Sequence, residues 1–196
     1  MKVGLIVEGD GEVYSLPILL RRVVSRLDPQ CQLVVLNPFR VPRGQLVKVE
    51  GVQRAVEFMA RKVGGDGRIL IMLDADDDLP CELGPQLLVR ARDCRPDRDI
   101  SVVVATREYE AWFLAAAESL RGERGLAADL TSPAHPEIIR DAKGWLSERM
   151  PSRYSETLDQ PALSAVFDLD MARRADSFDK LFREVGRLMG LAVPPR

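Results

Sequence analysis

The chain contains few of the residues on which several common protein classes depend. Its 196 residues include three cysteines and one histidine. Cys31, Cys81 and Cys94 are an odd number without C-x-x-C spacing, which argues against a disulfide framework or a cysteine zinc site. The lone His135 lies between prolines, and nothing around it indicates a histidine-based catalytic triad. These absences lead us to expect a protein of the reducing cytoplasm.

Long apolar runs and an excess of one charge are also absent. The first apolar run stops at Glu8, too short for a signal sequence, and no stretch reaches the roughly 18 apolar residues of a membrane span. We expect a soluble protein with no membrane partner. Lys plus Arg number 28 against 30 Asp plus Glu, and this net charge of -2 excludes a uniformly basic nucleic-acid coat. A polyanionic partner must therefore be bound by a local patch or through a metal.

Several familiar nucleotide and catalytic motifs are missing. The chain has no G-x-x-x-x-G-K-[ST] P-loop and no G-x-S-x-G nucleophile elbow. Gly9 and Gly11 begin like a dinucleotide fingerprint, but Tyr14 stands where the third glycine belongs. Asp78 stands where a D-x-D-x-[TV] phosphatase needs Thr or Val, and Glu8 is followed by glycine, not by the second acid of a receiver-type phosphoacceptor. The sequence therefore favours none of these classes.

Short apolar runs alternate with helical periodicity over the first two thirds of the chain. The runs predict strands over 2–7, 31–36, 68–73 and 100–105, and the periodicity predicts helices over 12–27, 49–63, 83–94 and 109–120. This alternation is typical of an α/β fold with a mainly parallel, Rossmann-like sheet flanked by helices. Beyond residue 125 we expect only helices, over 138–150, 155–167 and 177–189. The prediction is one domain, with an α/β core over 1–124 and a helical extension over 125–196 packed on it.

Acidic residues follow two of the predicted strands. Glu8 ends the first, and Asp74 and Asp76 end the third, with Asp77 and Asp78 continuing the run. Ligands of such sheets bind beyond the carboxyl ends of the strands, and residues two apart in an extended chain project to the same side. Converging carboxylates repel one another unless they are protonated or bind a hard cation such as Mg²⁺ or Mn²⁺. The pattern predicts a divalent-metal site, the alternative being a solvated loop or a charged helix start.

The same residues resemble a known family. Val7-Glu-Gly-Asp-Gly-Glu12 and Leu73-Asp-Ala-Asp-Asp-Asp78 are similar to the metal-binding motifs of the Toprim (topoisomerase-primase) fold. The first motif looks most like that of OLD-type and RloB-like nucleases, with Gly11 where Thr or Ser is usual. The segment 107–115 resembles a helix start in their small bacterial relatives of unknown function, often encoded beside an ATPase. Segments 154–161 and 177–178 resemble that family more weakly.

The resemblance implies both an activity and a set of residues. It implies a Mg²⁺- or Mn²⁺-dependent phosphodiester hydrolase acting on DNA or RNA, working with a separate ATPase in a phage defence or toxin-like system. The catalytic residues would be Glu8, Glu12, Asp74 and Asp76, and the metal ligands would be these with Asp78 and Glu110. Glu12 and Glu110 also suit the first turn of a helix for purely structural reasons. The alternative function is a non-catalytic regulatory or interaction subunit of an ATPase complex, with a structural or vestigial acidic site.

Basic and aromatic residues supply further candidates. Arg40 and Arg43 follow the second predicted strand in a Pro-rich loop and could contact phosphates, although solvated loop charges are the simpler account. Lys143 could neutralise charge in the transition state. Trp112 and Trp145 could each pack in a core or stack on a base.

Overall fold

The computed structural model describes all residues, 1–196, and is built around one parallel sheet. Its strands are β1 (Lys2–Val7), β2 (Val34–Val35), β3 (Phe39–Arg40), β4 (Arg68–Asp74) and β5 (Ile100–Ala105). The order across the sheet is β2-β1-β4-β5, and β3 also pairs with β1. Every pairing is parallel. The predicted α/β fold with a mainly parallel, Rossmann-like sheet is confirmed.

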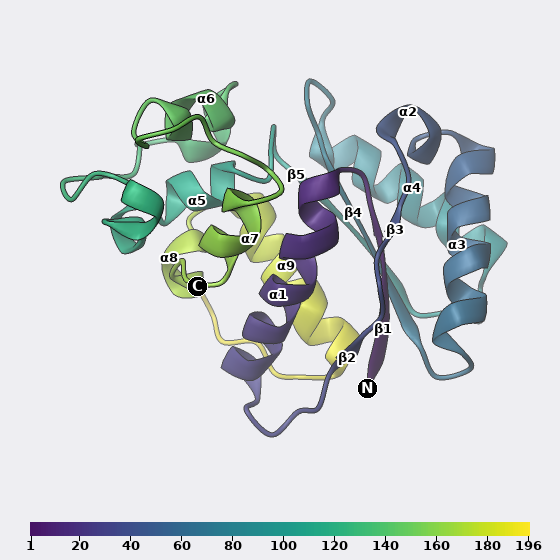
Figure 1. Cartoon of the computed structure of the whole chain (residues 1–196). Coiled ribbons are helices and arrows are strands. Elements are labelled where there is room, and N and C mark those ends of the chain that lie inside the picture. Colours follow the sequence, from purple (N-terminus) through teal and green to yellow (C-terminus); the bar gives the residue numbers. More distant parts are fainter.

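Helices cover both faces of this sheet. They are α1 (Asp10–Leu27), α2 (Arg43–Leu46), α3 (Val49–Val63), α4 (Pro80–Cys94), α5 (Ala111–Ala115), α6 (Ala142–Ser147), α7 (Asp159–Ser164), α8 (Leu169–Ala172) and α9 (Asp176–Met189), with 3-10 turns at Ala117–Leu120, Glu123–Gly125 and Pro136–Ile138. Helices α1 and α9 lie on one face and α3 and α4 on the other (Figure 1). No helix has both the length and the apolar character that crossing a membrane requires.

Successive residues of β1, β4 and β5 point alternately into two separate hydrophobic cores, one on each face of the sheet. In β1, Leu5 and Val7 point into the core shared with α1 and α9, whereas Ile6 points into the core shared with α3 and α4. Because both faces are covered, the strands read as continuous apolar runs, which is why their positions could be predicted.

The second predicted strand is the main departure from the expected elements. Only Val34–Val35 is regular there, and the unpredicted β3 follows after Asn37-Pro38. Leu36 N donates to the carbonyl of Val3 (2.9 Å) and Val41 N to that of Val7 (2.8 Å), so the chain runs beside β1 on either side of the interruption. Proline lacks the N–H that a continuous ladder needs, which accounts for the break.

Between β5 and α9 the helices are shorter than predicted. The helix expected over 109–120 divides into α5 and a 3-10 turn, and those expected over 138–150 and 155–167 shrink to α6 and α7. Helix α9 agrees with the prediction to one residue. Helix α7 packs on α1, and α9 packs on both α1 and β5 (Figure 1). Trp112 is fully buried and donates from Nε1 to Ser177 Oγ (2.8 Å), so it is a core residue and not a platform for a base.

Candidate functional site

The candidate site lies at the carboxyl ends of two adjacent strands. Glu8 directly follows β1, Asp74 is the last residue of β4, and Val7 pairs with Met72 across these strands. The helices that follow, α1 and α4, leave toward opposite faces of the sheet (Figure 1). A crevice of this kind, where successive connections diverge, is where parallel α/β proteins bind ligands. The sequence placed Glu8 and Asp74 at this edge correctly.

Two glutamates from helix starts join them. Glu12 lies in the first turn of α1 and Glu110 immediately precedes α5, and these two residues are 7% and 0% exposed. Asp74 Oδ1 accepts a hydrogen bond from Tyr109 N (2.9 Å), which ties the end of β4 to the start of α5. We call Glu8, Glu12, Asp74 and Glu110 the acid cluster.

The charges in the acid cluster act on one another. Burial raises the pKa of Asp74 well above its ordinary value, and the neighbouring charges of Glu110, Glu12 and Glu8 raise it further. Burial also raises the pKa of Glu110 to about 7, even though Lys143 opposes the shift. The pKa of Glu8 is raised by burial, against the opposing effect of Arg43. Full ionisation of the four carboxyl groups is therefore unfavourable unless the cluster binds a proton or a cation.

Three oxygens of the acid cluster have no hydrogen-bond partner. They are Glu8 Oε2, Glu12 Oε2 and Glu110 Oε2, and all three are buried. Buried polar atoms in proteins usually have a hydrogen bond, so carboxylate oxygens without one at this sheet edge call for an explanation. Carboxylate oxygens are the ligands that Mg²⁺ and Mn²⁺ prefer, so the donor chemistry fits such an ion. As the side chains stand, however, no group of three or more His, Cys, Asp or Glu residues is arranged to hold a metal.

Arg43 neutralises one side of the site. Its Nη1 lies 3.7 Å from Glu8 Oε2, its Nε lies 3.2 Å from Asp76 Oδ2, and its Nη2 lies 2.5 Å from Asp78 Oδ2. It also donates to the backbone carbonyls of Asp74 and Ala75. The guanidinium thus binds the chain segment that follows β4.

Lys143 neutralises the other side. Its Nζ lies 3.4 Å from Glu110 Oε2, 3.4 Å from Glu156 Oε1 and 4.0 Å from Glu108 Oε2. Burial alone would lower the pKa of Lys143, but the charges of Glu110 and Asp74 outweigh it and raise that pKa above its ordinary value. Two of the basic candidates, Arg43 and Lys143, therefore border the acid cluster.

The remaining sequence candidates lie at its margin. Strand β4 ends at Asp74, and Asp76 has a left-handed backbone (φ 50°). The chain is not extended there, so the prediction that Asp74 and Asp76 project to the same side because they are two apart in a strand is wrong. The Asp76 side chain is 60% exposed and faces Arg43. Asp78 is likewise exposed and bound to Arg43. Arg40 pairs with Asp10 (3.0 Å) and forms no ion pair with the acid cluster.

A second left-handed residue stabilises the loop that holds Asp76. Arg107, after β5, has φ 64°. Asp76 N donates to the carbonyl of Arg107 (3.1 Å), and Arg107 Nη1 donates to the carbonyl of Asp76 (2.9 Å). Left-handed conformations of residues other than glycine are strained and concentrate at functional sites. The loops after β4 and β5 therefore hold each other in place at the edge of the candidate site.

The C-terminal region supplies residues that sequence reasoning missed. Tyr154 OH donates to Glu110 Oε1 (2.9 Å), and Gln160 Nε2 lies within hydrogen-bond distance of both Glu110 and Glu12. Neither residue has a local pattern that links it to an acid more than 40 positions away. The only signal was the weak family resemblance over 154–161.

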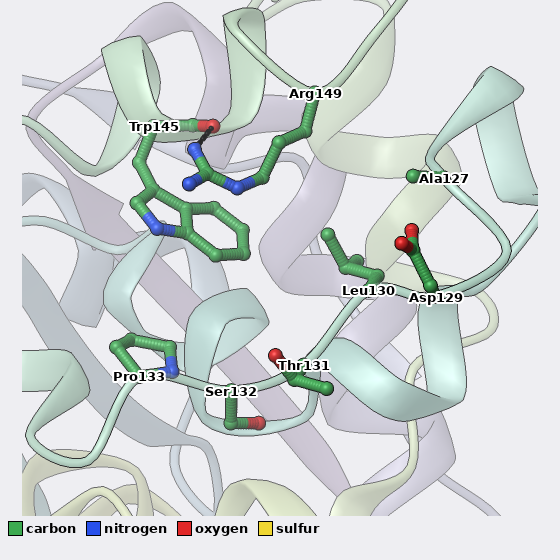
Figure 2. A pocket seen from close by; sticks show the side chains of 8 residues that line it. All are labelled: Ala127, Asp129, Leu130, Thr131, Ser132, Pro133, Trp145 and Arg149. Atoms are coloured by element: carbon green, nitrogen blue, oxygen red, sulfur yellow. Dashed lines mark hydrogen bonds between the residues drawn. The ribbon is translucent and has the colours of Figure 1, made fainter.

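Two cavities lie near α6 but contain no residue of the acid cluster. One, of about 390 Å³, is lined by residues that include Trp145 and Arg149, whose guanidinium lies 4.0 Å from the Trp145 ring centroid (Figure 2). The other, of about 150 Å³, is polar and lies between Asp76, Arg107 and Arg140. His135 is exposed, and Cys31, Cys81 and Cys94 are free thiols.

Together the fold and the site define a class: an α/β protein with a parallel Rossmann-like sheet and an acid cluster at its carboxyl edge. Comparison with family models identifies the family within this class. It belongs to the family described as "Domain of unknown function (DUF4276)", whose model matches residues 7–186. That match begins at Val7 and ends within α9, so it covers the whole candidate site. No curated protein and no solved structure matches the chain.

Proposed function

We propose that this protein is a Mg²⁺- or Mn²⁺-dependent phosphodiester hydrolase that acts on nucleic acid in the manner of Toprim nucleases. The observation that carries the proposal is the acid cluster, in which one buried oxygen each of Glu8, Glu12 and Glu110 accepts no hydrogen bond. Four acids face only two cations here, Arg43 and Lys143, and a divalent cation is the partner that would bind several buried carboxylates together. The order of the acidic motifs along the chain, which resembles that of Toprim proteins, supports the same function.

The residues divide into ligands and neutralising cations. Glu8, Glu12, Asp74 and Glu110 would hold the metal, with Asp76 and Asp78 at its margin. A divalent cation bound there supplies Lewis acidity and lowers the pKa of a water molecule. Arg43 and Lys143, which already face these acids, would balance the charge of a phosphate group brought to the site.

The proposal also includes a partner, a separate ATPase, and a location, the cytoplasm. The near-neutral chain has no P-loop of its own, and the resemblance to ATPase-linked nucleases supports a separate ATPase that gates the activity in a bacterial defence system. Weak unaided affinity for a polyanion is expected at this net charge. The proposed location is the cytoplasm.

A second function is favoured by a different observation. Arg43 already pairs with Glu8, Asp76 and Asp78. In the present side-chain positions, no group of three or more acidic residues is arranged to bind a metal ion. A protein whose acidic edge is neutralised internally could serve as a non-catalytic subunit of an ATPase complex. In that case the acid cluster would be structural.

Metal titration followed by cleavage assays separates the two functions. Mn²⁺ binding is measured by calorimetry, and cleavage of DNA and of RNA is measured with and without the neighbouring ATPase and nucleotide. Glu12→Gln and Asp74→Asn should abolish Mn²⁺-dependent cleavage, whereas Glu123→Gln, at an exposed glutamate without an ion pair, should not. A chain that binds no Mn²⁺ and cleaves nothing under any of these conditions would leave only the second function.

A further inference from the structure

Gln160 occupies an unusual position between two acids of the cluster. It lies in the first turn of α7 and is 1% exposed. Its Nε2 lies 3.1 Å from Glu110 Oε1 and 3.3 Å from Glu12 Oε1. Its Oε1 accepts a hydrogen bond from Ser15 Oγ (2.8 Å). Because carboxylates only accept and the Ser15 hydroxyl can donate, these partners determine which end of the amide faces the acids.

The backbone of α1 leaves space for this amide at Gly11. A Cβ on Gly11 would lie 2.9 Å from Gln160 Cδ and 3.0 Å from the carbonyl of Glu156, and still closer to Gln160 Oε1. Gly11 has no left-handed backbone, so no demand of its own conformation explains a glycine there. Glycine is required at position 11 because the Gln160 side chain packs directly against the backbone of α1, where a Cβ atom would collide with it. The same fact accounts for the missing hydroxyl at position 11, because any side chain would displace the glutamine.

We propose that Gln160 is a positioning residue of the acid cluster: one side-chain amide holds Glu12 and Glu110 together and leaves the second oxygen of each outside its hydrogen bonds, available to a cation. The two glutamates come from α1 and from the start of α5, and no hydrogen bond joins them directly. Each has one oxygen bound to Gln160 and the other, Oε2, without a hydrogen bond. Glu110 Oε2 faces the Lys143 ammonium at 3.4 Å, which a bound metal ion would replace as the neighbouring cation. Tyr154 OH adds a second donor to the bound oxygen of Glu110. This inference rests on the proposed metal site and adds that the C-terminal region completes it.

Two independent substitutions test the role of Gln160. Gln160→Met keeps the length of the side chain and removes both polar groups. Gly11→Ala keeps Gln160 but places a methyl group where its amide lies, in a helix where alanine is otherwise favoured over glycine. The matched controls are Gln86→Met, at an exposed glutamine of α4, and Gly44→Ala, where an added Cβ meets nothing within 4 Å.

The measurement is Mn²⁺ affinity of the full chain by electron paramagnetic resonance, with the melting temperature recorded for each variant. Gln160→Met and Gly11→Ala should each weaken Mn²⁺ binding by about tenfold to a hundredfold, as loss of a group that orients metal ligands typically does. In a Gln160→Ala background, Gly11→Ala should cause little further loss, since both changes act through the same amide. The controls should bind Mn²⁺ like the wild type.

The outcomes separate this inference from the proposed function. If the wild type binds Mn²⁺ and both variants stay within twofold of it, the positioning role is refuted and the metal site stands. If Gln160→Met lowers affinity only in proportion to unfolding and Gly11→Ala, still folded, binds normally, the residue is structural and the inference is again refuted. If the wild type binds no Mn²⁺ at all, the proposed function fails first and the inference fails with it.

Discussion

Replacing Glu110 by glutamine removes one buried charge with little change of shape. The pKa of Glu110 is raised from its ordinary 4.5 to about 7, mainly by burial, so the folded protein binds a proton between these values that the unfolded chain has released. Stability therefore falls as pH rises through this window and reaches its lower level above pH 7. At about 1.4 kcal/mol per pKa unit, the loss attributable to Glu110 is about 3 kcal/mol.

Glu110→Gln should therefore stabilise the metal-free protein at high pH. The pKa of about 7 already includes the attraction of Lys143. The gain is nevertheless smaller than the full value, because an amide N–H of glutamine would face the Lys143 ammonium, whose Nζ lies 3.4 Å from Glu110 Oε2. We expect a net gain of about 1 to 2 kcal/mol at pH 8 and no gain at pH 5, where the wild-type side chain is also neutral in the folded state.

Urea unfolding in EDTA at pH 5, 6, 7 and 8 measures this effect, with Glu123→Gln as the exposed control. Addition of Mn²⁺ at a hundredfold excess over its dissociation constant should stabilise the wild type at pH 8 by about 2.7 kcal/mol and Glu110→Gln much less. Two results would show that burying the ionised Glu110 carboxylate costs no stability. One is a variant less stable than the wild type at pH 8 in EDTA, and the other is a stability difference that stays the same from pH 5 to 8.

Further expectations concern the other parts of the site and the core. Asp74→Asn should abolish metal-dependent cleavage, whereas Asp76→Asn, at a 60% exposed side chain, should reduce it less, as measured by initial rates at saturating Mn²⁺. Trp112→Ala should cost about 3 to 5 kcal/mol in urea unfolding, because it opens a cavity beside Phe178 and leaves Ser177 without its donor. A cost below 1 kcal/mol would contradict this account of the core. If an ATPase gates the activity, the isolated chain should cleave poorly with strong salt sensitivity, and the complex should cleave when nucleotide is added. Equal rates with and without the partner would exclude gating.

Local sequence patterns determined much of the scaffold. The apolar runs of β1, β4 and β5 and the periodicity of α3 and α9 could be read directly, because each element buries a face whose spacing is set by its own geometry. Since parallel strands end at a common edge, the same patterns placed Glu8 and Asp74 beside each other.

Tertiary structure decided the rest. The turn at Asp76 depends on hydrogen bonds to Arg107, and the division of the edge strand into β2 and β3 depends on continued pairing with β1. The contacts of Gln160 with Glu12 and of Tyr154 with Glu110 span 148 and 44 positions of sequence. No local spacing encodes such contacts, because they form only when α7 packs against α1 and brings the C-terminal region over the acidic edge of the sheet.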